Sequence, residues 1–169
     1  MKKGDRIPDI SFRTRSLGEW KNVSTDDYFK GKRVILFALP GAFTPTCSTK
    51  QVPAFDELYS QILELGIDEV YCVSVNDGFV MKAWMEQLGV KNLKYLADGS
   101  GDFTRRMGML VKKDNVGFGE RSWRYSAIIE DGVVANLWAE NGICNNCEID
   151  PYENSNPDKL IAYLKQYCD

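Results

Sequence analysis

A threonine and a cysteine stand three residues apart in the segment PGAFTPTCSTKQVP, which begins at Pro40. The segment joins an apolar run, residues 33–39, to an amphipathic pattern that begins near Pro45. If a helix begins there, Cys47 lies in its first turn, where unpaired backbone N–H groups and the positive end of the helix dipole favour a thiolate over a thiol. Thr44 stands about one turn earlier, so its hydroxyl can reach the sulfur and an incoming oxygen atom. The pattern indicates a reactive cysteine, because a polar turn between two prolines is a poor place for a packed, inert one.

The chain has five cysteines and no histidine. A Cys-His dyad, a Ser-His-Asp triad and a metal site with histidine ligands are therefore excluded. The odd number and wide spacing of the cysteines do not fit the disulfide framework of a small secreted protein. We expect a cytoplasmic protein whose reactive thiol is activated by dipoles, hydroxyls or cationic side chains.

The length and charge of the chain limit the number of domains and the kinds of partner. With 169 residues, 44% of them hydrophobic, the chain can bury one sizeable core, and we expect a single domain, residues 1–169. The 21 basic and 24 acidic residues are mixed along the chain and give a net charge of −3, which argues against a nucleic-acid partner. No stretch is apolar and long enough for a signal peptide or a membrane span, so we expect no membrane partner.

The elements that position Cys47 follow from hydrophobic periodicity. Two apolar runs rich in β-branched residues, 33–39 and 69–75, predict buried strands, and the first 32 residues are interpreted as an irregular start. Helical patterns follow each run, and Asp131-Gly132 predicts a hairpin turn between two further strands. The remaining predicted elements are a strand at 93–98, a short helix at 101–108, a polar loop at 112–121 and a terminal helix from Asn156 and Pro157. This order predicts an α/β protein with a thioredoxin-like fold, a central mixed sheet flanked by helices.

The segment PGAFTPTCS resembles the peroxiredoxin signature, and the chain is similar to the peroxiredoxin-5 subfamily over nearly its whole length. The segments that carry the resemblance are GDRIPDISF, VSVNDGFVMKAW, LADGSGDFTRRMGM and RYSAIIEDGVV. The resemblance implies that Cys47 is the peroxidatic cysteine, that Thr44 and Arg124 complete the active site, and that Pro40 shields the thiolate. It also implies a thiol-dependent peroxidase acting on hydrogen peroxide and alkyl hydroperoxides, typically a homodimer, with no metal, flavin or nucleotide cofactor.

Elementary chemistry supports an arginine at this site. Attack of sulfur on a peroxide builds negative charge on the leaving oxygen, and a guanidinium aimed at that oxygen stabilises the transition state. Arg124 begins a predicted strand, and Arg121 is its rival three residues upstream. We prefer Arg124 because it directly precedes an aromatic-Ser pair, as the family arginine does. The chain departs from the subfamily at Gln51, where a histidine is common; glutamine still forms hydrogen bonds but does not titrate.

The sequence leaves open which thiol reduces Cys47 after a peroxide has oxidised it, and the other cysteines bear on this question. Cys72 alternates within an apolar strand and is interpreted as an inert core residue, and Cys168 has no motif around it. Cys144 and Cys147 form a C-x-x-C pair, which is a redox pair, half a zinc site or a coincidence. Their context predicts two loop thiols. The segment NCEIDPYENSN resembles peroxiredoxin domains fused to glutaredoxin, in which a cysteine aligns with Cys147.

Two routes of regeneration follow. We favour a one-cysteine mechanism in which glutathione, with a separate glutaredoxin, reduces oxidised Cys47. The alternative is an intramolecular disulfide from Cys47 to Cys144 or Cys147, with thioredoxin as the reductant. Two other hypotheses are a holdase or binding module that has lost the peroxidase chemistry, and a disulfide oxidoreductase that uses the C-x-x-C pair.

Three aromatic residues are candidates for a dimer interface or for the core: Phe43, Phe79 and Trp84. Phe43 is also a candidate wall of the opening through which the substrate enters.

Overall fold

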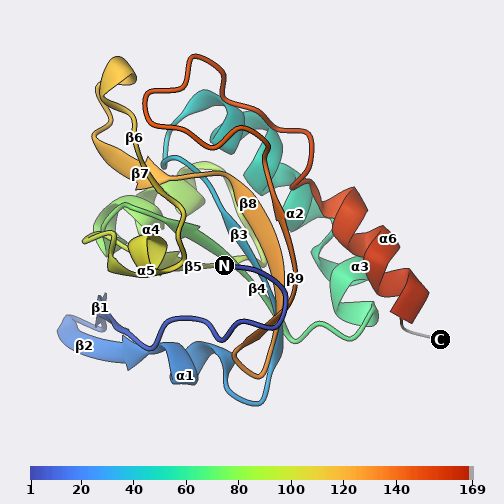
Figure 1. Cartoon of the computed structure of the whole chain (residues 1–169). Coiled ribbons are helices and arrows are strands. Elements are labelled where there is room, and N and C mark those ends of the chain that lie inside the picture. Colours follow the sequence, from blue (N-terminus) through green and yellow to red (C-terminus); the bar gives the residue numbers. More distant parts are fainter. Residues whose placement is uncertain (168–169) are drawn as a thin grey trace.

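A computed structural model, which describes residues 1–167, has a five-stranded mixed sheet at its centre (Figure 1). The strand order is β5-β4-β3-β8-β9. β3, β4 and β5 are parallel, β8 is antiparallel to β3, and β9 is antiparallel to β8. The strands are β3 Arg33–Ala38, β4 Glu69–Ser74, β5 Lys94–Ala97, β8 Tyr125–Glu130 and β9 Val133–Ala139.

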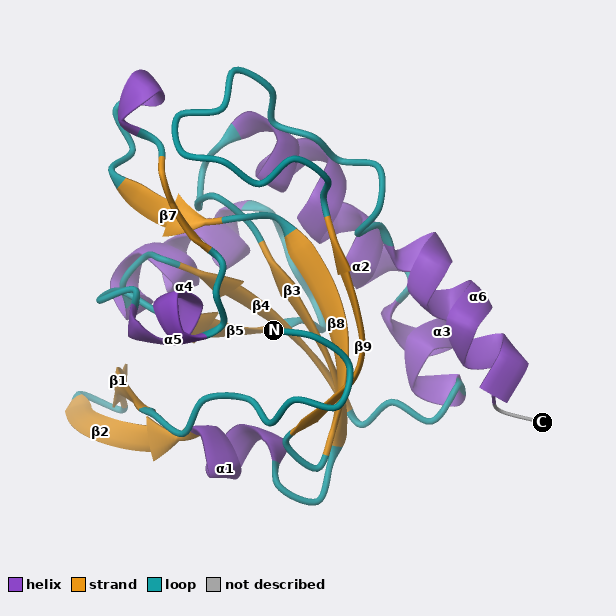
Figure 2. Cartoon of the chain, in the orientation of Figure 1, coloured by secondary structure: helices purple, strands orange, loops and turns teal. Residues whose placement is uncertain are grey.

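Helices cover both faces of this sheet (Figure 2). They are α1 Thr25–Phe29, α2 Val52–Glu57, α3 Tyr59–Glu64, α4 Gly78–Gln87, α5 Asp102–Arg106 and α6 Pro157–Tyr167. Side chains alternate between the two faces of the sheet along each strand. In β3, Val34, Leu36 and Ala38 face α1 and α5, whereas Ile35 and Phe37 face α2, α3, α4 and α6. Two apolar layers result, and the predicted thioredoxin-like α/β fold is confirmed.

The central strands and the hairpin that follows agree with the sequence prediction. From Val34 onward β3 is buried along its length, because the sheet is covered on both sides. Asp131 and Gly132 both have positive φ, 47° and 79°, as the predicted two-residue turn requires. The turn joins β8 to β9, and the antiparallel pairing of β8 with β3 places the start of β8 beside the end of β3.

The prediction of an irregular N-terminal segment is wrong. Residues 11–24 form an antiparallel hairpin, β1 Ser11–Ser16 and β2 Glu19–Ser24, and α1 follows at once. Leu17 and Gly18 make its turn with φ of 51° and 80°. A leucine is an unusual residue at positive φ, so the turn lacks the usual sequence signal. The predicted polar loop at 112–121 also contains structure: β6 Leu110–Lys112 and β7 Glu120–Ser122 form a second small hairpin.

The predicted helix after the reactive segment is present but interrupted. It begins at Pro45, widens into a π-helical turn, η1 Cys47–Gln51, and continues as α2 and α3. It ends at Glu64, two residues before Gly66, which has φ of 90°. Pro53 has no backbone N–H, and its ring crowds the carbonyl four residues earlier, which disfavours a regular α-helical ladder at this point. The π-turn therefore lies directly before the proline, and Cys47 stands at its first position.

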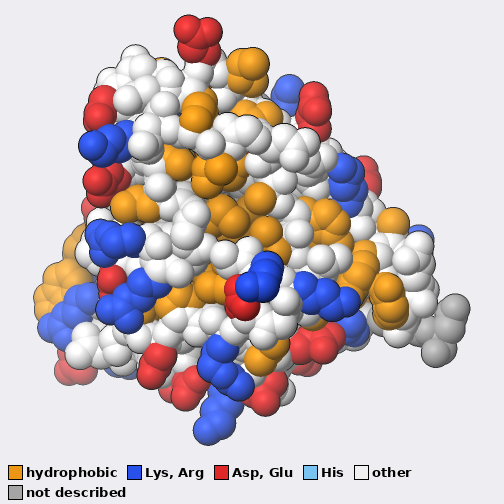
Figure 3. Space-filling model, in the orientation of Figure 1, with side chains coloured by type: hydrophobic (Ala, Val, Ile, Leu, Met, Phe, Trp, Pro, Cys, Tyr) orange, Lys and Arg blue, Asp and Glu red, His pale blue; other side chains and the backbone are white. Residues whose placement is uncertain are grey.

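The surface carries charges of both signs in a mixed pattern on the face shown in Figure 3. Apolar side chains appear between them as scattered patches, one of which lies over the β1–β2 hairpin. Within residues 1–167, no helix is long and apolar enough to cross a membrane.

Candidate active site

Cys47 is a buried thiol at the junction between the central sheet and its covering helix. Its side chain is 1% exposed and, within residues 1–167, is not disulfide-bonded. The turn from Pro40 to Thr44 leads out of β3 and includes Phe43 at φ 64°. This turn is held by the segment that follows β4, because the Ala42 N–H donates to the Asn76 side chain at 3.0 Å. The predicted placement of Cys47 in the first helical turn is confirmed.

Arg124 reaches the sulfur from the neighbouring strand. It directly precedes β8, its side chain is 1% exposed, and its Nη1 donates to Cys47 Sγ at 3.5 Å. The same Nη1 donates a short hydrogen bond to Gln51 Oε1. Its Nη2 donates to Asp150 Oδ2 at 2.7 Å, an ion pair that is partly open to solvent because Asp150 is 45% exposed. Two side chains that are distant from Arg124 in the sequence, Gln51 and Asp150, therefore hold its guanidinium beside the thiol.

Gln51 also holds the other side of this cluster. It is completely buried, and its Nε2 donates to the Ala38 carbonyl at 3.1 Å. The expectation that glutamine at this position forms hydrogen bonds is confirmed. The side chain ties the π-turn both to the end of β3 and to Arg124, so that Cys47 and Arg124 share one rigid frame.

The charges at the site are coupled. Burial lowers the pKa of Arg124, but the Cys47 thiolate and the Asp150 carboxylate raise it by more, so that the net shift is upward. The guanidinium is thus positive at every physiological pH and favours a negative charge on the sulfur. Burial lowers the pKa of Arg121, and the Cys47 thiolate partly offsets this shift.

Arg121 lies at the same site but holds the backbone instead of the sulfur. It belongs to β7, and its Nη1 donates to the Pro40 carbonyl at 3.1 Å while Nε donates to the Phe118 carbonyl at 3.2 Å. A Cβ atom on Gly41 would collide with its guanidinium, so the close approach requires glycine there. Of the two arginines weighed from the sequence, the structure places Arg124 on the sulfur and Arg121 on the turn.

Thr44 and Pro40 lie in that turn. The Thr44 hydroxyl donates to the Gly41 carbonyl at 2.7 Å. The hydroxyl proton is therefore used in this bond instead of reaching the Cys47 sulfur, as the sequence suggested, and the oxygen is left as an acceptor. Pro40 is buried two residues after the end of β3, and its carbonyl is the acceptor for Arg121.

The segment after β9 carries three residues of the site that the sequence did not indicate. Glu140 is buried and its carboxylate accepts the backbone N–H groups of Glu153, Asn154 and Ser155 at 2.5–2.9 Å. This anchor holds the loop that presents Asp150 to Arg124 and places the Tyr152 ring 5.6 Å from the same guanidinium. In Figure 1 the loop arches over the start of the helix that bears Cys47. Single acidic residues in a polar loop have no recognisable pattern, so this contact was not predictable.

The other cysteines take three different places. Cys72 is fully buried in β4, and burial, together with the charge of Cys47, raises its pKa well above the ordinary value. The interpretation of Cys72 as a core residue is confirmed. Cys144 and Cys147 lie in a loop as predicted, but they are joined in a disulfide, with Cα atoms 5.6 Å apart, instead of being two thiols. Cys168 lies outside the described residues.

The three candidate interface aromatics separate clearly. Trp84 is fully buried and its indole N–H donates to Ser48 Oγ at 2.9 Å, so it belongs to the core beside Cys47. Phe43 and Phe79 are 49% and 62% exposed. No group of three or more cysteines and carboxylates within residues 1–167 is arranged to hold a metal ion.

Comparison with known proteins agrees with this geometry. Residues 2–154 match the Redoxin family. The chain is 54% identical to a peroxiredoxin of Rhizobium etli over 95% of this chain and 94% of that protein. It is 44% identical to the hybrid peroxiredoxin hyPrx5 of Haemophilus influenzae, covering 96% of this chain and 66% of that protein. Among solved structures, it is similar to the antioxidant protein (1-Cys peroxiredoxin) of Plasmodium falciparum, with a TM-score of 0.93, 34% identity, and coverage of 97% of this chain and 99% of that one.

Proposed function

The chain belongs to the peroxiredoxin family, and from this premise we propose that it reduces hydrogen peroxide and organic hydroperoxides with the Cys47 thiolate as the nucleophile. Membership of the family supports a thiol-dependent peroxidase. The observation that carries the assignment to Cys47 is the 3.5 Å contact between Arg124 Nη1 and Cys47 Sγ, with both groups buried and fixed by neighbours.

The chemical step is an in-line displacement on oxygen. The thiolate sulfur attacks one peroxide oxygen, an S–O bond forms, and the O–O bond breaks. The electron pair of that bond goes to the second oxygen, which takes up a proton and leaves as water or an alcohol. Cys47 is oxidised to a sulfenic acid and the peroxide is reduced.

Arg124 is the residue that we propose to stabilise this step. Its positive charge favours the thiolate before attack and the developing negative charge on oxygen afterwards. Both Nη atoms of the guanidinium are held, Nη1 by Gln51 and Nη2 by Asp150, so little reorganisation is needed during the reaction. Arg121 supports the turn through the Pro40 carbonyl and acts as a positioning residue.

Thr44 and Pro40 shape the place of the peroxide. The Thr44 oxygen has donated its proton to Gly41, so we propose that it accepts the hydrogen of the incoming O–H group. Pro40 contributes a rigid wall without a competing N–H group. The half-exposed ring of Phe43, in the same turn, is a candidate apolar rim for an organic hydroperoxide.

For regeneration we propose a one-cysteine mechanism with glutathione and glutaredoxin. Cys72 is fully buried in the sheet, and Cys144 and Cys147 are bonded to each other. Within residues 1–167, no exposed free thiol is therefore offered to Cys47. The similarity to a protein described as a 1-Cys peroxiredoxin favours the same route. The alternative remains a disulfide from Cys47 to Cys144 or Cys147, reduced by thioredoxin, after reduction of the pair.

Reduction by any external thiol requires movement, because the Cys47 side chain is 1% exposed. A mixed disulfide cannot form until the sulfur reaches the surface, so the first turn must open locally. The π-turn from Cys47 to Gln51, followed by Pro53, has an irregular hydrogen-bond ladder and is the natural place for this opening.

We propose a homodimer that uses the exposed rings of Phe43 and Phe79. Phe43 lies in the active-site turn, with its ring 6.5 Å from the Trp84 ring, and Phe79 lies at the start of α4. Large exposed aromatic side chains of this kind are typical anchors of protein interfaces.

A coupled assay tests the reaction and the reductant together. Peroxide consumption is measured with glutathione and glutaredoxin, and separately with thioredoxin and its reductase, for the wild type, Cys47→Ser and a Cys144→Ser/Cys147→Ser double variant. We expect activity with glutathione in the wild type and the double variant, and none in Cys47→Ser. Turnover by Cys47→Ser at the wild-type rate would remove the assignment.

Three other outcomes identify the competing hypotheses. Thioredoxin-dependent activity that disappears in the double variant would favour the intramolecular disulfide. Insulin reduction that survives in Cys47→Ser and disappears in the double variant would indicate a disulfide oxidoreductase that uses Cys144 and Cys147. Absence of peroxide consumption in the wild type with both reductants would leave a binding or holdase module.

A further inference from the structure

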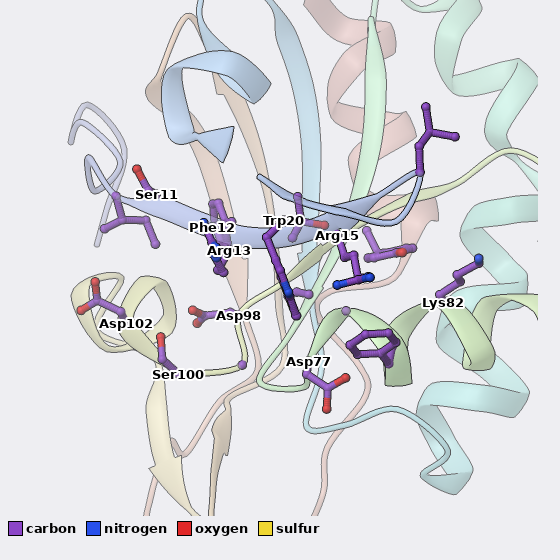
Figure 4. Close-up of a pocket in the computed structure, with 18 of the residues that line it drawn as sticks. Ser11, Phe12, Arg13, Arg15, Trp20, Asp77, Lys82, Asp98, Ser100 and Asp102 are labelled. Carbon is purple, nitrogen blue, oxygen red and sulfur yellow. The ribbon is translucent and has the colours of Figure 1, made fainter. Parts of the chain in front are cut away.

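The cavity beside the β1–β2 hairpin, about 460 Å³ in volume, is separate from the active site (Figure 4). Arg13 and Arg15 lie on either side of Trp20, with their guanidinium groups 5.5 and 5.3 Å from the centre of the indole ring. The ring is therefore covered by the chain itself. The feature that the proposed chemistry leaves without a role is the disulfide of the C-x-x-C pair, in the loop that arches over the helix bearing Cys47.

The disulfide closes a tight turn, residues 144–147, which is bonded to the outer edge of the β6–β7 hairpin. The Lys112 N–H donates to Asn145 Oδ1 at 2.8 Å, and the Asn146 N–H donates to the Lys112 carbonyl at 2.7 Å. The Asn115 N–H donates to Asn146 Oδ1 at 3.1 Å, and Asn115 Nδ2 donates to the last carbonyl of the turn at 3.2 Å. These four hydrogen bonds dock the turn on the hairpin.

The segment that continues from this turn covers the active site. Asp150 accepts from Arg124 Nη2 at 2.7 Å, and the Tyr152 ring lies 5.6 Å from the same guanidinium. Burial raises the pKa of Tyr152 to about 12, and the negative charge of Cys47 contributes to the rise, so the ring is close to the sulfur as well. Residues 144–152 are called the cover below.

The cover is anchored at its far end and depends on the docked turn at its near end. Glu140 accepts the backbone N–H groups of residues 153–155, directly after the cover. Between these two anchors, the ion pair with Arg124 contributes little by itself, because the Asp150 carboxylate is 45% exposed. The bonds between the turn and β6 therefore hold the near end of the cover on the active site.

The disulfide stabilises the docked form of the turn. Asn146 adopts φ of 53°, which a free chain visits rarely. A covalent link between residues 144 and 147 restricts the conformations of the undocked turn, so that less entropy is lost when the turn docks. Cys144 is exposed, so that an external thiolate can reach its sulfur.

We propose that the Cys144–Cys147 disulfide is a redox-sensitive lock: it keeps the cover closed over Cys47, and its reduction opens the cover to the external thiol that regenerates oxidised Cys47. The proposal rests on the peroxidase function proposed above, whose reductant must reach a sulfur that is 1% exposed. Opening of the cover also frees the π-turn, because Arg124 joins Asp150 of the cover to Gln51 of the π-turn through its two Nη atoms.

The lock opens by thiol–disulfide exchange with a dithiol reductant. One thiolate of the reductant attacks the exposed Cys144 sulfur, a mixed disulfide forms, and Cys147 leaves as a thiolate that takes up a proton. The second thiol of the reductant then attacks the mixed disulfide and releases Cys144. The pair has gained two electrons and two protons, and the reductant has become a disulfide. The route to Cys47 therefore opens when thiol reductant is plentiful.

Hydrogen exchange measured by mass spectrometry tests the lock without peroxidase chemistry. A Cys47→Ser/Cys168→Ser protein is compared after oxidation of its C-x-x-C pair by diamide and after reduction by dithiothreitol. We expect amide exchange in the peptides that contain Lys112, Asn115 and Asn146 to be about tenfold faster in the reduced form, with no change in β3. Equal exchange in the two forms would overturn the proposal.

The rate at which glutathione reacts with the sulfenic acid of Cys47 tests the consequence for the active site. After one equivalent of hydrogen peroxide, the first turnover is followed in Cys168→Ser with the pair oxidised, and in the same protein with Cys144→Ser and Cys147→Ser added. We expect adduct formation to be about tenfold faster without the disulfide, and the rate constant with peroxide to stay within about fivefold.

Equal rates of adduct formation would overturn the proposal. Formation of a disulfide from Cys47 to either cysteine of the pair, in the reduced Cys168→Ser protein, would also overturn it, because the pair would then resolve the sulfenic acid instead of locking the cover. If the wild type does not consume peroxide at all, the proposed function fails, whereas a difference in hydrogen exchange still supports the lock.

Substitutions at Asn145 separate the docking from the chemistry of the thiols. Asn145→Ala keeps the disulfide but removes the bond to the Lys112 N–H, and we expect glutathione to react about 2- to 10-fold faster with oxidised Cys47. Asn145→Asp keeps an acceptor oxygen and should restore the wild-type rate. Asn141→Ala is the matched control, at an exposed position of the same loop. An Asn145→Ala protein that behaves like Asn141→Ala would overturn the role of the docked turn.

Discussion

Replacing Gln51 by leucine tests whether the position of Arg124 depends on this buried amide. The substitution nearly preserves side-chain volume but removes the hydrogen bonds to Arg124 and to the Ala38 carbonyl. A buried donor, Arg124 Nη1, and a buried acceptor, the Ala38 carbonyl, then each lose one hydrogen-bond partner, and each loss costs about 1–3 kcal/mol. We therefore expect the free energy of unfolding to fall by about 2–6 kcal/mol.

The same substitution should slow the chemistry. Arg124 Nη1, which lies 3.5 Å from Cys47 Sγ, loses the partner that aims it. If the transition state loses the equivalent of one charge-assisted hydrogen bond, about 1.5–3 kcal/mol, the second-order rate constant with hydrogen peroxide falls about 10- to 100-fold. Stopped-flow mixing of reduced protein with peroxide measures this constant directly, and urea denaturation measures the stability.

The control is Gln61→Leu, which makes the same change on the exposed surface of α3. It should leave the rate constant unchanged. A Gln51→Leu protein that is folded and reacts within about twofold of the wild type would refute the reasoning, because Arg124 would then be positioned without its amide partner.

Three further results are expected. Asp150→Asn should lower the rate constant only about 2- to 5-fold, since its ion pair with Arg124 is partly solvated; a loss as large as that of removing the arginine would contradict this view of the pair. Peroxide should change the fluorescence of Trp84, because its indole N–H donates a hydrogen bond to Ser48, the residue next to Cys47. If the amplitude of the fluorescence change is the same in Trp84→Phe, another residue reports the reaction. Burial raises the pKa of Cys72, so the folded chain keeps a thiol proton that the unfolded chain loses at high pH, and stability to urea should fall as the pH rises above about 8.5. Cys72→Ala should show a shallower decline in stability between pH 8 and 10. An equal decline in both proteins would contradict the raised pKa of Cys72.

Local patterns predicted the parts of the fold that depend on neighbouring residues. The strands β3 and β4 were visible as apolar runs, and Asp131-Gly132 as a turn, because burial and backbone conformation act directly on those residue types. Cys47 was visible for the same reason, as a cysteine at a helix start. The β1–β2 hairpin was not visible, because Leu17 occupies a turn position that usually requires glycine or asparagine.

The contacts that complete the site depend on tertiary structure. Asp150 lies 26 residues from Arg124 and Gln51 lies 73 residues from it, and no periodicity relates such distances. Only the packing of β8 against β3, and the anchoring of the last loop by Glu140, bring these groups together. The disulfide between Cys144 and Cys147 is likewise set by the turn of the loop, which the composition does not specify.

The most direct test of the central assignment is intact mass spectrometry of the reduced protein after one equivalent of hydrogen peroxide, with and without glutathione. We expect the mass of one oxygen atom on Cys47 in the absence of glutathione, one glutathione adduct on Cys47 in its presence, and no change at that position in Cys47→Ser. Oxidation that spares Cys47, or that proceeds equally fast in Cys47→Ser, would contradict the assignment of this cysteine as the peroxide-reducing residue.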